Sequence, residues 1–163
     1  MIRPFEPRDA EAVTAMLMPL FRAGDTYTVD PYIEPADALA YWTGGERRVF
    51  VAESEGALLG TYYIVRNQKG GGSHVCNCGY VTAEAARGRG VARAMLAHSL
   101  DLAPTLGFRA MQYNFVVATN TRAIETWQRA GFEIVGRLPG AFEHPGGGET
   151  DALVMYRRLD ARS

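Results

Sequence analysis

The sequence has no excess of positive charge. Its 17 Lys and Arg are balanced by 18 Asp and Glu, for a formal net charge of −1. Because a nucleic-acid partner normally requires a basic face, this balance argues against DNA or RNA binding. The chain also has no apolar run long enough to cross a bilayer. Its first residues, MIRPFEPRDAEAV, lack the basic region and apolar stretch of a signal peptide. We therefore expect a cytoplasmic protein with no membrane partner.

Cysteine is scarce as well. The chain has only Cys76 and Cys78, two residues apart in a segment that is typical of a strand. Alternate side chains of a strand point to the same face, which is a poor geometry for a mutual disulfide. No second pair of cysteines or histidines completes a metal site. The two cysteines are therefore predicted to be reduced, buried thiols, and no metal is expected.

No linker, repeat or low-complexity tract divides the chain, so residues 1–163 are predicted to form a single domain. Hydrophobic periodicity and turn residues predict a mixed α/β fold. The predicted strands are 2–5, 47–54, 58–67, 74–82, 108–117, 132–138 and 151–159, and the predicted helices are 7–21, 35–42, 91–106 and 119–130. Residues 139–149, rich in Gly and Pro, are predicted to be a loop. Residues 74–117 form a strand, helix and strand, a unit that joins two parallel strands by a right-handed crossover.

An unusual run of Arg87, Gly88, Arg89 and Gly90 lies between the strand and the helix of this unit. The first N–H groups of a helix are unpaired and favour an anion, and glycines let a ligand approach the backbone. The run therefore predicts an anion-binding turn; the alternative is a plain turn with two solvated arginines. No Lys-Ser/Thr follows the glycines, which excludes a P-loop, and Arg93 breaks the dinucleotide pattern G-x-G-x-x-G.

Two motifs in this part of the chain point to a known family. Arg87, Gly90 and Ala92 fit Arg-x-x-Gly-x-Ala, which resembles the pyrophosphate-binding motif of the GNAT superfamily of N-acetyltransferases. Downstream, residues 120–138 resemble the second motif of that family, Asn-x-x-Ala-x-x-x-Tyr-x-x-x-Gly-Phe. The matching residues of this second motif are Asn120, Ala123, Gly131 and Phe132. The order and spacing of the two motifs also match.

This resemblance implies a mixed, mostly antiparallel sheet of about seven strands with about four helices. Two central parallel strands, 74–82 and 108–117, would splay apart around acetyl-coenzyme A (acetyl-CoA), and the backbone around residues 80–82 would polarise the thioester. The residues that the resemblance assigns to acetyl-CoA are Tyr80, Val81, Thr82, Arg87, Gly88, Arg89, Gly90, Val91, Ala92, Asn120, Ala123 and Trp127. The amine would attack directly, without a covalent enzyme intermediate.

One position departs from the family pattern. Many members carry a tyrosine that protonates the leaving thiolate, but this sequence has Trp127 there. An indole N–H donates a hydrogen bond but is not a useful acid near neutral pH. A nearby tyrosine, a water or direct departure of the thiolate must therefore serve, and Trp127 itself is expected to pack.

Three asparagines are the candidate catalytic residues. Asn77 and Asn114 lie in the two central strands, which are expected to be buried on both faces, and Asn120 precedes a helix. Singly, each has a structural alternative, as a satisfied core amide or a helix cap. The segments HVCNCGYV and NFVVATN resemble those of the fungal N-acetyltransferase type that acts on the proline analogue azetidine-2-carboxylate. That resemblance assigns Asn77 and Asn114 to the substrate pocket and Asn120 to the reacting groups. The loop with Tyr27 and Asp30 is the other predicted pocket wall.

These features predict an acetyl-CoA-dependent N-acetyltransferase that acts on a small-molecule amine, such as an amino acid or a toxic analogue. A protein or peptide amine is the second enzymatic reading, favoured if the groove is open rather than roofed by residues 24–31 and 139–148. A coenzyme A (CoA)-binding module without turnover is the third, because the usual tyrosine and a carboxylate in strand 74–82 are both absent. The sequence leaves the oligomeric state open, with a homodimer as one option.

Overall fold

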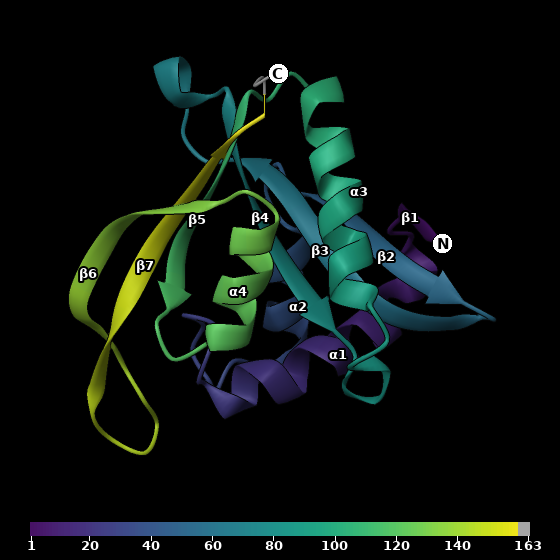
Figure 1. Ribbon diagram of the computed structural model, residues 1–163. Coiled ribbons are helices and arrows are strands. Elements are labelled where there is room, and N and C mark those ends of the chain that lie inside the picture. Colours follow the sequence, from purple (N-terminus) through teal and green to yellow (C-terminus); the bar gives the residue numbers. More distant parts are fainter. Residues whose placement is uncertain (160–163) are drawn as a thin grey trace.

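A single seven-stranded sheet organises the computed structural model, which describes residues 1–159 (Figure 1). The strands are β1 (Ile2–Pro4), β2 (Arg48–Ser54), β3 (Ala57–Arg66), β4 (Val75–Thr82), β5 (Ala110–Val117), β6 (Glu133–Glu143) and β7 (Glu149–Arg158). Their order in the sheet is β1-β2-β3-β4-β5-β7-β6. All neighbours are antiparallel except β4 and β5. The mixed, mostly antiparallel fold predicted from the sequence is confirmed.

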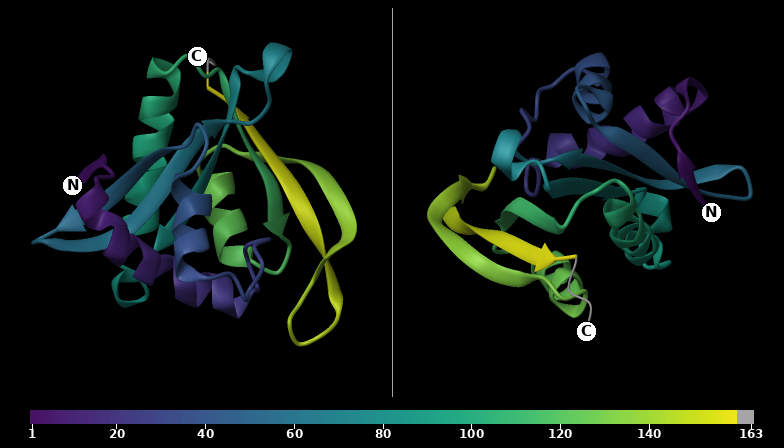
Figure 2. Two further views of the ribbon diagram at one scale, coloured as in Figure 1. Left: turned by 180° about the vertical axis from the view of Figure 1, so that it is seen from behind. Right: turned by 90° about the horizontal axis from the view of Figure 1, so that it is seen from above.

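The α-helices cover both faces of the sheet (Figure 2). They are α1 (Ala10–Ala23), α2 (Pro35–Thr43), α3 (Val91–Thr105) and α4 (Thr121–Arg129). α1 and α2 pack on one face, where Leu17 and Trp42 are fully buried, and α3 and α4 pack on the other around Met95. Because cores lie on both faces, the middle of β3 is buried on its two sides: Tyr62 joins the α3 core and Tyr63 joins the α2 core.

The two central strands separate soon after they meet. β4 and β5 pair at Val75 with Ala110 and at Cys76 with Met111, and no further pair joins them. Beyond this point β4 keeps only its partner β3, and β5 keeps only β7. The predicted splay of these strands is therefore present. Its consequence corrects one expectation: Asn114 lies past the last pair and is exposed rather than buried on both faces.

The region after residue 138 was predicted to be a long loop, which is wrong. β6 continues to Glu143, and Phe142 and Glu143 pair with Thr150 and Glu149 of β7. The register shifts between Leu138 and Phe142, where Gly140 has a φ of +60°. A glycine at such a bulge lets the strand resume its pairing, so Gly and Pro here interrupt a hairpin without ending it.

Two smaller expectations concern the cysteines and the membrane. Cys76 and Cys78 are both buried and form no disulfide, as predicted, and both face the α3 core. Among residues 1–159, no helix combines the length and the apolar character that a membrane span requires.

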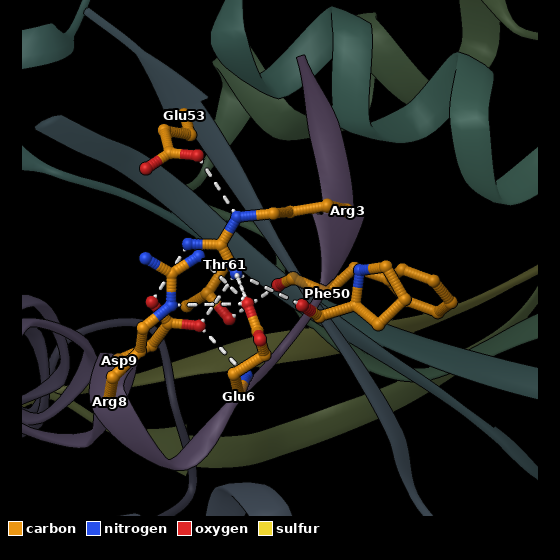
Figure 3. A network of polar contacts seen from close by, with 8 residues as sticks. Arg3, Glu6, Arg8, Asp9, Phe50, Glu53 and Thr61 are labelled. Carbon is orange, nitrogen blue, oxygen red and sulfur yellow. Dashed lines mark hydrogen bonds and ion pairs between the residues drawn. The ribbon is translucent and has the colours of Figure 1, made fainter. Parts of the chain in front are cut away.

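An ion-pair network fastens the start of the chain to β2 (Figure 3). The guanidinium of Arg3 donates two bonds of 2.9 Å to the Asp9 carboxylate and one of 3.0 Å to Glu53 Oε1. Asp9 Oδ2 also accepts the Glu6 N–H at 2.8 Å. The bonds from Arg3, and then the Glu6 N–H, hold the pKa of Asp9 below its usual range against the opposing effect of burial. Asp9, only 5% exposed, therefore joins β1 to the start of α1 as a buried anion.

We expect Asp9→Asn to lower the free energy of unfolding by about 2–4 kcal/mol, because the Arg3 charge loses its bidentate partner. Folding lowers the pKa of Asp9, so its contribution is present above the unfolded value of about 3.9 and is lost as the pH falls through the lower folded value. Urea unfolding at pH 7 and at progressively lower pH measures both effects. Glu133→Gln, an exposed carboxylate on β6, is the control; equal losses in the two variants would contradict this role of Asp9.

Candidate active site

A cavity of about 1280 Å³ lies where β4 and β5 separate. It is lined from both faces of the sheet, by α1 and the loop that follows it on one face and by α3 and α4 on the other. The predicted site residues that line it are Tyr27, Asn77, Tyr80, Val81, Thr82, Arg87, Gly88, Gly90, Val91, Ala92, Asn114, Asn120, Ala123 and Trp127. Arg89 and Asp30 do not line it; the Asp30 carboxylate accepts the Tyr32 N–H at 2.9 Å.

The glycine turn opens into this cavity at the N-terminus of α3. Gly88 and Gly90 both have a φ of +79°, and a Cβ on either would meet no atom within 4 Å. Gly90 is the N-cap residue and no side chain caps the helix, so the first N–H groups of α3 remain available to a ligand. Positive φ favours glycine over any other residue, which explains why the turn needs both glycines.

The charge of the cavity suits an anion. Five arginines line it against two carboxylates, Asp25 and Glu84. The arginines are Arg47, Arg87, Arg93, Arg122 and Arg129. Open N–H groups at the start of α3 combined with the Arg87 guanidinium of the same turn form a donor set that fits a phosphate-bearing group such as the pyrophosphate of CoA.

The open edge of β4 supplies backbone donors. The Asn67 N–H bonds the Val75 carbonyl on the β3 side, whereas the Arg109 N–H bonds the His74 carbonyl on the β5 side. Because bonding direction alternates along a strand, the even-numbered residues of β4 turn their backbone groups toward the gap. There the Tyr80 carbonyl accepts the Tyr27 hydroxyl at 3.2 Å. Its acceptor is thus satisfied by Tyr27, while the N–H of Tyr80 faces the cavity without a ladder partner.

The three asparagines differ in how many hydrogen bonds their side-chain amides already make within the protein. Asn114 belongs to an amide chain: Gln112 donates to its Oδ1 at 2.9 Å, and its Nδ2 donates to Asn67 Oδ1 at 2.7 Å. Asn120 caps α4 by accepting the Ala123 N–H at 3.4 Å. The half-buried amide of Asn77 makes no side-chain hydrogen bond within residues 1–159, so it is the one most available to a ligand.

Trp127 packs at the border of the cavity. Its ring centroid lies 5.3 Å from that of Tyr80 and 4.8 Å from that of Tyr113. The Tyr80 hydroxyl is 2.7 Å from Ser99 Oγ and 3.1 Å from the Tyr113 hydroxyl. Burial raises the pKa of both tyrosines well above the usual value, so both stay neutral at pH 7. The packing role expected for Trp127 agrees with these contacts.

Three of the lining residues that were not among the predicted site residues form a cluster of their own. Tyr41 of α2, Arg47 and Tyr63 of β3 lie together on the α2 face, with the Arg47 guanidinium over both rings at 4.9 and 4.7 Å. Arg47 stands next to Arg48 in the sequence, and no local pattern separates the lining arginine from the exposed one. Tyr63 lies in a mostly apolar strand, so the sequence indicates an ordinary core residue there.

Comparison with known proteins identifies the family. The model of the "Acetyltransferase (GNAT) family" matches residues 11–132, which include the glycine turn and the four matching residues of the second motif. The chain belongs to the GNAT family. The prediction that this protein is an N-acetyltransferase enzyme is thereby confirmed.

Individual relatives support this assignment over different lengths. A GCN5-related N-acetyltransferase structure from Kribbella flavida is 38% identical, with a TM-score of 0.90 over 97% of this GNAT chain and 96% of that one. The "N-acetyltransferase aca1" of Schizosaccharomyces pombe is 36% identical over 85 residues, which are 52% of this chain but only 41% of that protein. The "Putative phosphinothricin acetyltransferase YwnH" of Bacillus subtilis is 26% identical over 97% of this chain and 98% of its own length.

The wall of the site depends on a glycine in β4. A Cβ on Gly79 would lie 2.5 Å from Cε2 of Tyr63, whose ring crosses the strand at this point. We expect Gly79→Ala to displace that ring and to lower the free energy of unfolding by about 1–3 kcal/mol. Urea unfolding is the measurement. Gly71→Ala, where a Cβ meets nothing within 4 Å, is the matched control, and a Gly79 variant as stable as this control would contradict the close contact.

Proposed function

We propose that this GNAT enzyme transfers the acetyl group of acetyl-CoA to the amine of a small molecule, by direct attack in a ternary complex. The observation that carries the proposal is the continuity of one cavity. It runs from the anion-binding turn at Gly88 and Gly90, past the unpaired edge of β4, to the free amide of Asn77. A cosubstrate and an acceptor therefore have room to meet at the gap between the strands.

The cosubstrate side rests on α3 and α4. Arg87, the two glycines and the first N–H groups of α3 would hold the pyrophosphate, while Asn120, Ala123 and Trp127 would border the arm that reaches into the gap. Acetyl-CoA supplies an activated acetyl thioester when bound.

The edge of β4 would stabilise the developing charge. The Tyr80 N–H points into the gap, and a preorganised N–H stabilises an oxyanion more strongly than bulk water does. The Tyr27 hydroxyl, by occupying the Tyr80 carbonyl, keeps an acceptor from repelling that oxyanion.

Proton transfer would proceed without a carboxylate from β4 or β5. The only acidic residues that line the cavity are Asp25 and Glu84 among residues 1–159, and Glu84 stands beside the glycine turn. An asparagine does not accept a proton at neutral pH, but Asn77 can orient the amine or a water that removes its proton. Trp127 would pack without protonating the thiolate.

The acceptor is proposed to be an amino acid or a related small amine. Its side of the cavity is walled by aromatic residues of the α2 face and by Tyr27, as expected for a small-molecule pocket. The name of the Bacillus subtilis relative, which matches nearly the full chain, supports a small-molecule acceptor. The fungal relative, which is named an N-acetyltransferase, is similar over about half of this chain. A thiol-release assay with acetyl-CoA across amino acids, simple amines and a peptide tests the proposal; turnover of the peptide alone would overturn it.

For the cosubstrate side, we expect Gly90→Val to abolish CoA binding, because the side chain would enter the space in front of the α3 N-terminus. Isothermal calorimetry with CoA measures the loss. Gly56→Val is the matched control, because Gly56 has a φ of +81° and equally open surroundings but lies in the turn between β2 and β3. If the folded Gly90 variant binds CoA as tightly as this control does, the turn is not the pyrophosphate site.

For the acceptor side, we expect Asn77→Ala to lower kcat while the KM for acetyl-CoA stays the same. Loss of one oriented contact at a reacting centre costs about 2–4 kcal/mol of transition-state stabilisation, or roughly 30- to 1000-fold in rate. Gln128→Ala removes an exposed amide of α4 that does not line the cavity and serves as control. Equal rates for the two variants would leave Asn77 as a core amide without a catalytic role.

A further inference from the structure

Arg47 is a cation in the cavity that neither the fold nor the cosubstrate explains. It follows α2 and precedes β2, and its guanidinium carbon lies 4.9 Å from the Tyr41 ring centroid and 4.7 Å from that of Tyr63. Its Nε atom is buried and has no hydrogen-bond partner. A buried donor without a partner is uncommon in proteins, and this one lines the cavity.

No carboxylate of the described chain neutralises Arg47. Its sequence neighbour Glu46 is engaged instead with Arg66, at 2.8 Å, and the other ion pairs among residues 1–159 do not involve Arg47. Burial raises the pKa of Tyr63 to about 12, so that side chain is neutral at pH 7 and does not neutralise the guanidinium. The guanidinium thus has two aromatic supports and no counter-ion.

The supports are held firmly by the α2 core. The Tyr63 ring lies 4.8 Å from that of Trp42, edge to face, and Trp42 donates to Thr61 Oγ1 at 3.1 Å. Tyr41 packs against Phe21 with ring centroids 6.0 Å apart. Because the rings do not have to move to receive a ligand, Arg47 is preorganised, which lowers the entropic cost of binding an anion.

The position of Arg47 assigns it to the acceptor rather than to CoA. Tyr63, on which it stacks, belongs to the α2 face, whereas Val91 and the glycine turn belong to the α3 face. Tyr63 pairs with Gly79, and Val65 pairs with Asn77. The two pairs are two residues apart along each strand, so their side chains lie on the same face of the sheet. The Tyr63 ring also crosses β4 at Gly79. Arg47 therefore lies on the same face of the sheet as Asn77, opposite to the face of the proposed pyrophosphate site.

We propose that Arg47, clamped over Tyr41 and Tyr63, binds the carboxylate of the acceptor and makes the enzyme selective for amines that carry an anionic group. A guanidinium accommodates a carboxylate through two parallel N–H bonds. With the carboxylate at Arg47, the amine of an amino acid faces Asn77 and the gap. This inference rests on the function proposed above and adds the residue that would select its substrate class.

The test compares L-alanine, L-leucine and L-proline, each with its primary amide, as acceptors for the wild-type enzyme and for Arg47→Met. Methionine keeps an apolar side chain over the rings but has no charge. We expect the KM for the acids to rise roughly 10- to 150-fold, as for the loss of a hydrogen bond to a charged group. The KM for the amides and for acetyl-CoA should be unchanged. Arg48→Met, which removes the adjacent exposed arginine, is the matched control and should behave as the wild type.

Two outcomes would overturn the proposal. The first is an equal KM of the wild-type enzyme for each acid and its amide. The second is an Arg47→Met variant whose KM rises to the same extent for acids and amides, as a merely structural role of Arg47 would produce. Calorimetry of the same acids and amides with the CoA-loaded protein separates this inference from the proposed function. If the wild type acetylates none of these amines, the proposed function fails, and acid binding that is lost only in Arg47→Met still supports the anion site. Equal acid binding by the two proteins overturns it.

Discussion

The separation of β4 from β5 is the constraint on which the site depends. A strand that leaves its partner exposes a row of N–H and C=O groups, and each must find water, a side chain or a ligand. This protein satisfies one acceptor of that row with the Tyr27 hydroxyl and leaves donors facing a cavity. The gap can stay open because each strand is secured on its other edge, β4 by β3 and β5 by β7.

The two faces of the sheet contribute different kinds of groups to the cavity. On the α3 face, a turn with two left-handed glycines and an uncapped helix start presents backbone donors. On the α2 face, a core rich in aromatic residues holds Tyr41 and Tyr63 in place beneath Arg47. The first arrangement suits a ligand recognised by its phosphates, and the second suits one recognised by shape and a single charge. Both meet at β4, the strand that contributes residues to each face.

The sequence predicted the parts of the site that depend on local geometry. Glycine adopts a positive φ more readily than any other residue, so a turn could be predicted at Gly88 and Gly90 from the sequence, and the structure gives both a positive φ and places both on the cavity. The order of strand, helix and strand predicted the parallel pair, because such a unit joins two parallel strands by a crossover. Arg89 could not be separated from Arg87 in this way, because only the path of the turn decides which arginine faces the cavity. The Gly140 bulge looks like a loop in the sequence because its register with β7 is a long-range property. Arg47 and Arg48 are alike in sequence, and they differ only through rings contributed by α2 and β3.

The two tryptophans of the chain lie on opposite faces of the sheet. Trp42 is fully buried in the α2 core and bonded to Thr61, whereas Trp127 is half-buried and borders the cavity between Tyr80 and Tyr113. Unfolding would change the surroundings of both indoles, whereas a ligand that enters the gap would meet Trp127 and not Trp42. A variant that keeps Trp127 as its single tryptophan would therefore carry an intrinsic optical probe at the gap itself, without any added label.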